Sequence, residues 1–244
     1  MMSGFGSKAR IGQLYPSGGL CDHEPQLMAP AGVQFLTTRL SFRKSRLEDD
    51  MALVDGMESH ARLLADARVD LIAFNCTAAA MLVGPDEINR RIGAATGIRS
   101  ITTIEAVVAA LDAAKLRRFA LMTPYLPDVV AAETAYFGAH GYSVAAHAGI
   151  PCEDPVAQGT IPPERWRELA RTLHDADCEG LLISCAGVQI APVLGRIERE
   201  FGRPVIASNQ ALVWRCLGLL GLPDRPAGFG ALLEGAFDRA PGSG

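Results

Sequence analysis

The stretch LIAFNCT (residues 71–77) decides the fold, together with LLISCAG (181–187) in the second half of the chain. Each is a short apolar run that ends at a cysteine and precedes sequence of helical character, which is typical of a buried parallel strand. This pattern places Cys76 and Cys185 at the carboxyl ends of strands, where open α/β sheets build their ligand sites. The two cysteines lie 109 residues apart (185 − 76).

Outward from these two stretches, strands and helices alternate along the chain. Further strands are predicted at 10–15, 33–38, 100–102, 118–123, 143–147 and 205–207. Apolar residues at helical spacing predict helices at 45–67, 77–95, 104–114, 128–139, 163–174, 188–201 and 210–220, the second of them kinked or broken at Gly84-Pro85. Strands that alternate with helices indicate parallel sheets with crossover helices.

The pattern restarts near the middle of the chain. RIGQLYPS (10–17) aligns with RFALMTPY (118–125) at an offset of 108, and Cys76 aligns with Cys185 at an offset of 109. We therefore predict an α/β fold of two pseudo-symmetric Rossmann-like lobes, each a parallel four-stranded sheet flanked by helices. The first lobe is expected to span 10–114 plus a C-terminal helical part at 208–244, and the second 115–207. The active site is expected in the cleft between the lobes.

Composition excludes several classes of function. The 244 residues are 49% hydrophobic and 20% charged with a net charge of −4, which is ordinary for a globular protein and gives no electrostatic footprint for nucleic acid. No apolar run approaches the length of a transmembrane helix, and the first ten residues lack a signal-peptide core. Six cysteines without C-x-x-C spacing favour reduced thiols in the cytoplasm. Five scattered histidines give little support for a metal site.

Two facing thiols predict a particular chemistry. One thiolate and one thiol on opposite faces of a carbon can remove a proton from one side and return it on the other. The same pair can add sulfur to an electron-poor double bond and protonate the adjacent carbon. A cysteine that precedes a helix is expected to lose its proton more easily, because backbone N–H groups and the helix dipole favour the thiolate. The alternative for each cysteine is simple packing in the core.

Further candidates follow other strand ends. The backbone N–H groups of Thr77, Ala186 and Gly187, just after the cysteines, are placed to bind a substrate carboxylate. Glycines permit a close approach of backbone amides to an anion, with a plain tight turn as the alternative. The remaining predicted binding residues are Ser17, Gly18 and Gly19 after the first strand, Tyr125 at the equivalent place in the second half, and Ser208 and Asn209.

Five sequence segments, taken in their order along the chain, resemble the aspartate/glutamate racemase superfamily. Within it they are most similar to the branch of maleate cis-trans isomerases and arylmalonate decarboxylases. The resemblance covers roughly residues 11–220 and rests on RIGQLYPS (10–17), FNCT (74–77), ALMTPY (120–125), LLISCAG (181–187) and PVIASNQA (204–211). It implies an enzyme without cofactor or metal, a small carboxylate or dicarboxylate substrate, and a homodimer or homotetramer. It also implies that Cys76 attacks the alkene, that Cys185 acts as acid and then base, and that Tyr125 binds a substrate carboxylate.

The resemblance leaves the substrate open. Decarboxylases of this branch carry glycine at the first-lobe position, so Cys76 favours two-thiol isomerase chemistry. The isomerases carry two asparagines that contact the dicarboxylate, where this chain has Gly19 and a segment around Asp154. The alternatives are an amino-acid or related racemase, an arylmalonate-decarboxylase-like enzyme, and a carboxylate-binding protein without activity.

Overall fold

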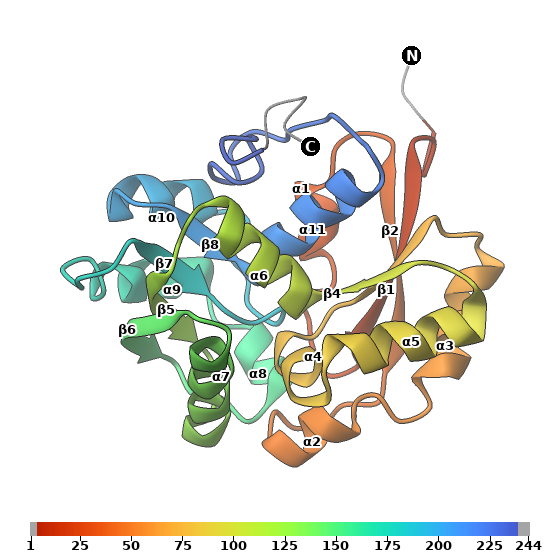
Figure 1. The fold of residues 1–244 in the computed structure, drawn as a ribbon, viewed down its shortest axis with the longest axis horizontal. Helices are drawn as coiled ribbons and strands as arrows, with labels where there is room; N and C mark the ends of the chain where they lie inside the picture. The colour runs from red at the N-terminus through yellow and green to blue at the C-terminus, as the bar shows by residue number, and fades with distance from the viewer. Residues whose placement is uncertain (1–3, 239–244) are drawn as a thin grey trace.

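Two parallel sheets of four strands each form the framework of the protein, in a computed structural model that describes residues 4–238. The first sheet has the order β2-β1-β3-β4, and the second has the equivalent order β6-β5-β7-β8 (Figure 1). Their bounds are β1 Ala9–Pro16, β2 Val33–Leu40, β3 Leu71–Phe74, β4 Ser100–Thr102, β5 Arg118–Thr123, β6 Ser143–Gly149, β7 Gly180–Ile183 and β8 Val205–Ala207. The predicted two-lobe α/β fold is confirmed.

The two cysteine strands occupy equivalent interior places. Every residue of β3 and of β7 is buried, and each strand pairs with the first strand of its sheet on one side and the last on the other. The register places Leu71 beside Ile11 in the first sheet and Leu181 beside Ala120 in the second. Interior strands of a parallel sheet are covered on both faces, which accounts for their unbroken apolar sequence.

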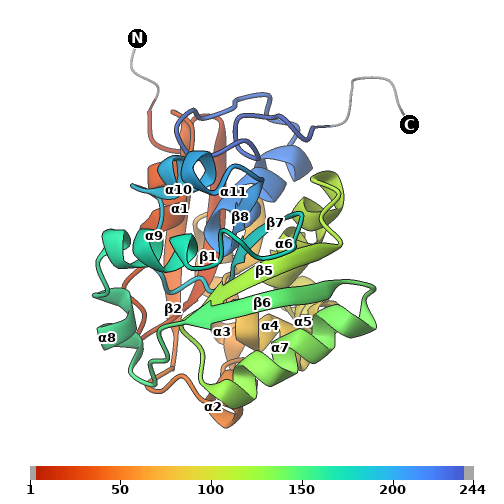
Figure 2. The same cartoon turned by 90° about the vertical axis from the view of Figure 1, so that its left-hand side faces the viewer.

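Helices cover both sheets. Those that follow the first sheet's strands are α1 Glu24–Met28, α2 Leu47–Ala52, α3 Met57–Asp66, α4 Thr77–Val83, α5 Pro85–Thr96 and α6 Thr103–Ala113. Those of the second half are α7 Pro127–Ala139, α8 Pro155–Gly159, α9 Pro163–Arg171, α10 Leu194–Phe201 and α11 Ser208–Leu219. Figure 2 shows α7 along β6, while α9 and α10 pack on each other and against the same sheet. Among residues 4–238, no helix is long and apolar enough to cross a bilayer.

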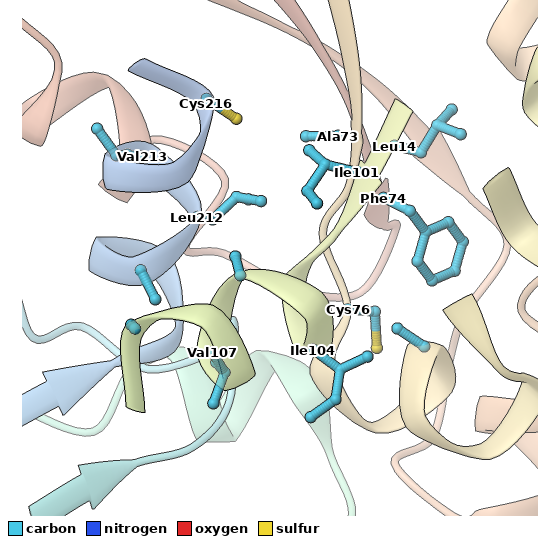
Figure 3. Packing of buried hydrophobic residues seen from close by; sticks show 14 of the residues in the cluster. Leu14, Ala73, Phe74, Cys76, Ile101, Ile104, Val107, Leu212, Val213 and Cys216 are labelled. Atoms are coloured by element: carbon cyan, nitrogen blue, oxygen red, sulfur yellow. The ribbon is translucent and has the colours of Figure 1, made fainter. Parts of the chain in front are cut away.

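The last helix returns to the first half of the chain. α11 packs against α6, and the buried side chains of both belong to the same hydrophobic cluster as β3 and β4. Figure 3 shows Leu212, Val213 and Cys216 of α11 in this cluster, with Cys76 at its edge. This packing supports the proposed division in which the segment after residue 207 joins the first lobe. Residues 239–244 of that segment lie outside the described part of the chain.

Two predicted helices were wrong in extent. The segment 45–67 forms two helices, α2 and α3, because Gly56 adopts a left-handed φ of +69° between them. The segment 188–201 becomes helical only at Leu194, and the residues before it form turns. The break at Gly84-Pro85 is confirmed, since Gly84 has a φ of +95° and separates α4 from α5. Both α1 and α8 were not predicted.

Candidate active site

A cavity lies where the ends of the two cysteine strands meet. Its wall includes Tyr15, Gly19, Asp50 and Cys76 from the first half of the chain, and Tyr125, Gln158, Cys185, Ala186 and Gly187 from the second. We call it the thiol cavity. The cavity is small, with a volume of about 30 Å³. The structure therefore brings the two predicted cysteines to one place.

Cys76 stands directly between β3 and α4. It is the residue that caps the N-terminus of α4, and its side chain is 8% exposed. Its thiol donates to Oδ1 of Asp50 at 3.7 Å. Burial raises the pKa of Cys76 well above the ordinary thiol value, and the nearby Asp50 carboxylate raises it further. The expected ease of deprotonation before a helix is thus outweighed by burial.

Cys185 has a different environment. Its backbone adopts a φ of +145°, which L-residues rarely adopt and which is found mostly at functional sites. Its sulfur accepts the backbone N–H of Gly187 at 3.1 Å and Nε2 of Gln158 at 3.3 Å. Burial raises the pKa of Cys185 to about 12, and the Gly187 N–H offsets part of this rise. Two N–H donors aimed at one sulfur favour its thiolate form.

Asp50 is the third reactive group of the thiol cavity, and the sequence analysis did not predict it. Its side chain on α2 is 1% exposed, and its second oxygen, Oδ2, has no hydrogen-bond partner within residues 4–238. Burial raises the pKa of Asp50 to about 7, against a smaller opposing effect of the Cys76 thiol. At neutral pH this carboxyl is therefore poised between its charged and neutral forms.

Two more polar atoms on the cavity wall lack partners. The Tyr125 hydroxyl, just after β5, and Oε1 of Gln158, on α8, are buried without a hydrogen bond in the described structure. Burial raises the pKa of Tyr125 well above its ordinary value, so its hydroxyl remains a neutral donor. Buried polar atoms are nearly always paired in native proteins. Three unpaired ones on a single wall, counting Oδ2 of Asp50, mark where a polar ligand would bind.

The first loop contributes less than predicted. Only Gly19 of the Ser17-Gly18-Gly19 loop lines the thiol cavity. The Ser17 hydroxyl instead accepts the N–H of Phe42 at 3.0 Å, and the Gly18 N–H donates to the carbonyl of Phe42 at 3.0 Å. A Cβ on Gly19 would lie 2.6 Å from Cε1 of Tyr15, so no side chain fits there. Contacts of Ser17 and Gly18 with a substrate stay predictions.

The loops that carry the two cysteines are held in place by hydrogen bonds of Thr77, Ser208 and Asn209. The Ser208 hydroxyl accepts the N–H of Cys185 at 3.1 Å and the Thr77 hydroxyl at 3.0 Å. The Asn209 amide donates to the carbonyl of Ala186 at 3.0 Å. These bonds join the two halves of the chain around the site, and their predicted contact with a substrate stays a prediction. Ala186 and Gly187 do line the cavity.

The polar side chain that reaches the cavity from the segment around Asp154 is Gln158, four residues further along the chain. Asp154 caps α8, since its carboxylate accepts the N–H of Val156 at 2.9 Å. The cap starts the turn that carries the buried Gln158 to Cys185. A Cβ on Gly187 would overlap Nε2 of Gln158, so a larger residue there would displace this amide from Cys185. The D-P-x-x-Q spacing after Asp154 was the available signal.

This arrangement can perform addition and proton transfer on a small unsaturated molecule. One thiol has a carboxylate beside it to receive its proton, and the other sulfur has donors that stabilise its charge. Among the described residues, no cluster of three or more His, Cys, Asp or Glu side chains is placed to hold a metal ion.

Comparisons with known proteins agree on one group. The family model that matches describes arylmalonate decarboxylases and covers residues 11–233. The maleate isomerase of Nocardia farcinica is 32% identical over 242 residues, which are 92% of this chain and 95% of the relative. The solved Nocardia farcinica maleate cis-trans isomerase bound to Tris superposes with a TM-score of 0.87 at 27% identity, covering 93% of this chain and 98% of that one.

A second structure of that enzyme bears on mechanism. It is a cysteine-to-serine mutant with a covalently bound succinylcysteine intermediate, with a TM-score of 0.85 at 26% identity. It covers 93% of this chain and 98% of the mutant chain. That enzyme therefore forms a carbon–sulfur bond between a cysteine and its substrate.

Proposed function

The chain belongs to the arylmalonate decarboxylase family, and from this premise we propose that it is a cis-trans isomerase of a small unsaturated carboxylate of the maleate type. Cys76 is the proposed nucleophile, and Cys185 is the proposed acid and then base. The observation that carries the proposal is that both thiols, from equivalent strand ends of the two sheets, line one cavity. A decarboxylase of the resembled type would have glycine in place of Cys76.

The first step joins the substrate to the protein. The Cys76 sulfur bonds to one alkene carbon while its proton passes to Asp50, whose Oδ1 lies 3.7 Å away. The π electrons move to the other alkene carbon, which takes the proton of Cys185. The product is a saturated thioether on Cys76, a protonated Asp50 and a Cys185 thiolate. The N–H groups of Gly187 and Gln158 stabilise that thiolate.

The second step reverses the first after rotation. The former double bond is now a single bond, so the two ends of the substrate can turn to the trans arrangement. The Cys185 thiolate then removes the proton from carbon, the carbon–sulfur bond breaks, and Cys76 recovers its proton from Asp50. Protons and electrons balance, and no further reactant is consumed.

Removal of either thiol tests this proposal. We expect Cys76→Ala and Cys185→Ala each to reduce the conversion of maleate to fumarate by at least about a thousandfold, because each thiol takes part in both steps. Cys178→Ala is the matched control, since that half-buried thiol lies outside the thiol cavity. Proton NMR of the reaction mixture measures both alkenes. Full activity in either of the first two variants would overturn the mechanism.

Separate assays distinguish the remaining alternatives. An amino-acid or related racemase would incorporate solvent deuterium at a retained saturated carbon, and a decarboxylase would release carbon dioxide. A binding protein without activity would be stabilised by the ligand without turnover. A homodimer or homotetramer in the cytoplasm completes the proposal.

A further inference from the structure

We propose that Asp50 makes the thiol cavity selective for a substrate with a single carboxylate and a neutral N–H donor, such as a primary amide, at its other end. The substrate class is then the monoamide of a cis-enedioic acid rather than the diacid itself. This inference rests on the proposed isomerase function and narrows its substrate.

The charge of the cavity wall is the first argument. Among the described residues that line the cavity, Asp50 is the only acidic one, and none is a lysine, an arginine or a histidine. On neighbouring loops, Arg43 is exposed and does not line the cavity, and three other basic side chains form ion pairs. Arg39 contacts Asp22 at 2.8 Å, and both Lys44 and Arg46 contact Glu153 at 3.3 and 2.5 Å. A dianion would therefore enter a site that offers it no cation and one carboxylate.

The unpaired polar atoms of the cavity wall give the second argument, because each is a known donor or acceptor and so requires a ligand group of the opposite kind. Oδ2 of Asp50 and Oε1 of Gln158 are acceptors in need of a donor. The Gln158 amide is fixed in this orientation, since its Nε2 donates to both Cys185 and the Gly187 carbonyl. The Tyr125 hydroxyl is a donor without a hydrogen bond to oxygen or nitrogen in the described chain, and the nearby Cys185 sulfur, whose pKa it lowers, is a weak acceptor. One carboxylate would accept from Tyr125, and the two N–H donors of a primary amide match the two acceptors in number.

A second carboxylate at the Asp50 end would be costly. Two like charges a few ångströms apart in a buried site repel strongly, because little water screens them. A dicarboxylate can avoid this repulsion only when Asp50 is protonated. Of the groups that face Asp50, the Cys76 thiol favours its charged form through its hydrogen bond, while Asp49 on the same helix and Asp128 on α7 oppose that form. Cys185 and Tyr125 across the cavity carry no positive charge.

The first loop cannot offer a compensating amide. An asparagine at position 19 would bring a neutral donor to the dicarboxylate, but the Tyr15 ring occupies the space that its side chain would need. Tyr15 is held there, because its hydroxyl donates to the Ala186 carbonyl at 3.2 Å and accepts the Cys21 N–H at 3.2 Å. The loss of that amide and the presence of Asp50 favour the same substrate class.

The test compares maleate with its monoamide, maleamate, as substrates of the full chain. Trans product is measured by proton NMR, and the readout is the ratio of kcat/KM for maleamate to kcat/KM for maleate. The ratio cancels any common effect of Asp50 on Cys76. At pH 8 we expect a ratio on the order of tenfold or more, increasing as pH rises through about 7 because Asp50 becomes charged.

Asp50→Asn is expected to lower that ratio by about tenfold or more and to remove the part of its pH dependence that Asp50 causes. The residual pH dependence in this variant then belongs to maleate itself. Glu48→Gln is the control, since it removes a negative charge from the same helix at an exposed position. It should leave the ratio unchanged.

The outcomes separate the two proposals. Isomerisation of both substrates with a ratio near one, or a ratio that Asp50→Asn leaves unchanged, overturns the selectivity and leaves the isomerase intact. Lack of turnover with both substrates overturns the isomerase and the selectivity with it. If Asp50→Asn does not fold, as judged by thermal unfolding, or is inactive because Cys76 has lost its proton acceptor, the ratio in the unsubstituted protein and its change with pH decide alone.

Discussion

Burial raises the pKa of both cavity thiols, so at neutral pH both carry their protons. The two sulfurs differ in what surrounds them rather than in how buried they are. Cys76 donates to a carboxylate, whereas Cys185 accepts from two N–H groups. The first environment favours release of a proton to Asp50, and the second stabilises a thiolate that forms during the reaction. This asymmetry supports the proposed order of roles.

Gln158 allows the role of Cys185 to be tested. Gln158→Leu removes an N–H donor from the thiolate, and a hydrogen bond to a charged group is worth about 1.5–3 kcal/mol. We expect kcat to fall roughly tenfold or more, with the pKa of Cys185 raised further. Gln189→Leu is the control, because that side chain donates to the Gly159 carbonyl and does not contact either thiol. Equal losses in the two variants would argue for a purely structural role.

At this scale the sequence predicted the residues that belong to strand ends and missed those on helices. Cys76, Cys185 and Tyr125 follow apolar runs whose direction is fixed by the sheet. Asp50 lies among Glu48 and Asp49, where an acidic run reads as a solvated face. Its burial results from how α2 packs beside α4, a tertiary contact that no local pattern reveals.

Between α2 and α3, a single backbone turn decides which face of α2 meets the site. Gly56 has a φ of +69° and immediately precedes α3. A continuous helix over 45–67 would follow one apolar stripe, whereas the break allows α2 to rotate independently and to bury Asp50 against Cys76. The spacing of apolar residues predicted one helix, because two polar or small residues, Asp55 and Gly56, are too short an interruption of that spacing to indicate a turn.

Two glycine substitutions test the importance of that turn. Gly56→Ala should destabilise the protein by roughly 1 kcal/mol, because alanine pays for the left-handed φ. Gly93→Ala, in the interior of α5, should stabilise it by roughly 0.5–1 kcal/mol through helix propensity. An added Cβ meets no atom within 4 Å at either position, so steric clashes do not contribute to the difference in stability between the two variants. Chemical denaturation measures both, and the same sign for the pair would contradict this reading.

Over the whole molecule, the internal repeat was visible in the sequence because equivalent strands kept similar residues and nearly one offset. The two sheets share one strand order, and the cysteine strands occupy the same place in each. The repeat did not predict how the halves differ. Cys76 precedes a helix, while Cys185 precedes a turn that extends to Val193. That difference gives each thiol its own partners.

Three buried carboxyls predict how the stability of the whole protein depends on pH. Burial raises the pKa of Glu24, Asp50 and Glu133 to about 7 each. The folded state then holds more protons than the unfolded chain between about pH 4.5 and 7, so the free energy of unfolding falls as pH rises through this range. His147, whose pKa burial lowers, opposes the three. Thermal unfolding should show a midpoint that decreases by several degrees from about pH 5 to 8.

Glu133 offers a direct check of that dependence. Its side chain is buried on α7, where one oxygen accepts the Ser184 hydroxyl and the other has no partner in the described chain. Glu133→Gln should flatten the decrease, because glutamine does not titrate. Glu168→Gln, which alters an exposed carboxylate, should not. A midpoint that rises from pH 5 to 8 in the unsubstituted protein would contradict the assignment.

The central claim is that two cysteines from two lobes act on one alkene, with Cys76 as the nucleophile. Peptide mapping by mass spectrometry after incubation of Cys185→Ser with maleate and maleamate tests it most directly. A serine hydroxyl can still deliver the proton in the addition step, but it does not form the base that removes that proton from carbon, so the adduct should accumulate. We predict the added mass of one substrate on Cys76, with none in the Cys76→Ser/Cys185→Ser double variant. An adduct on another cysteine, or no adduct on Cys76 from either substrate, would contradict the claim.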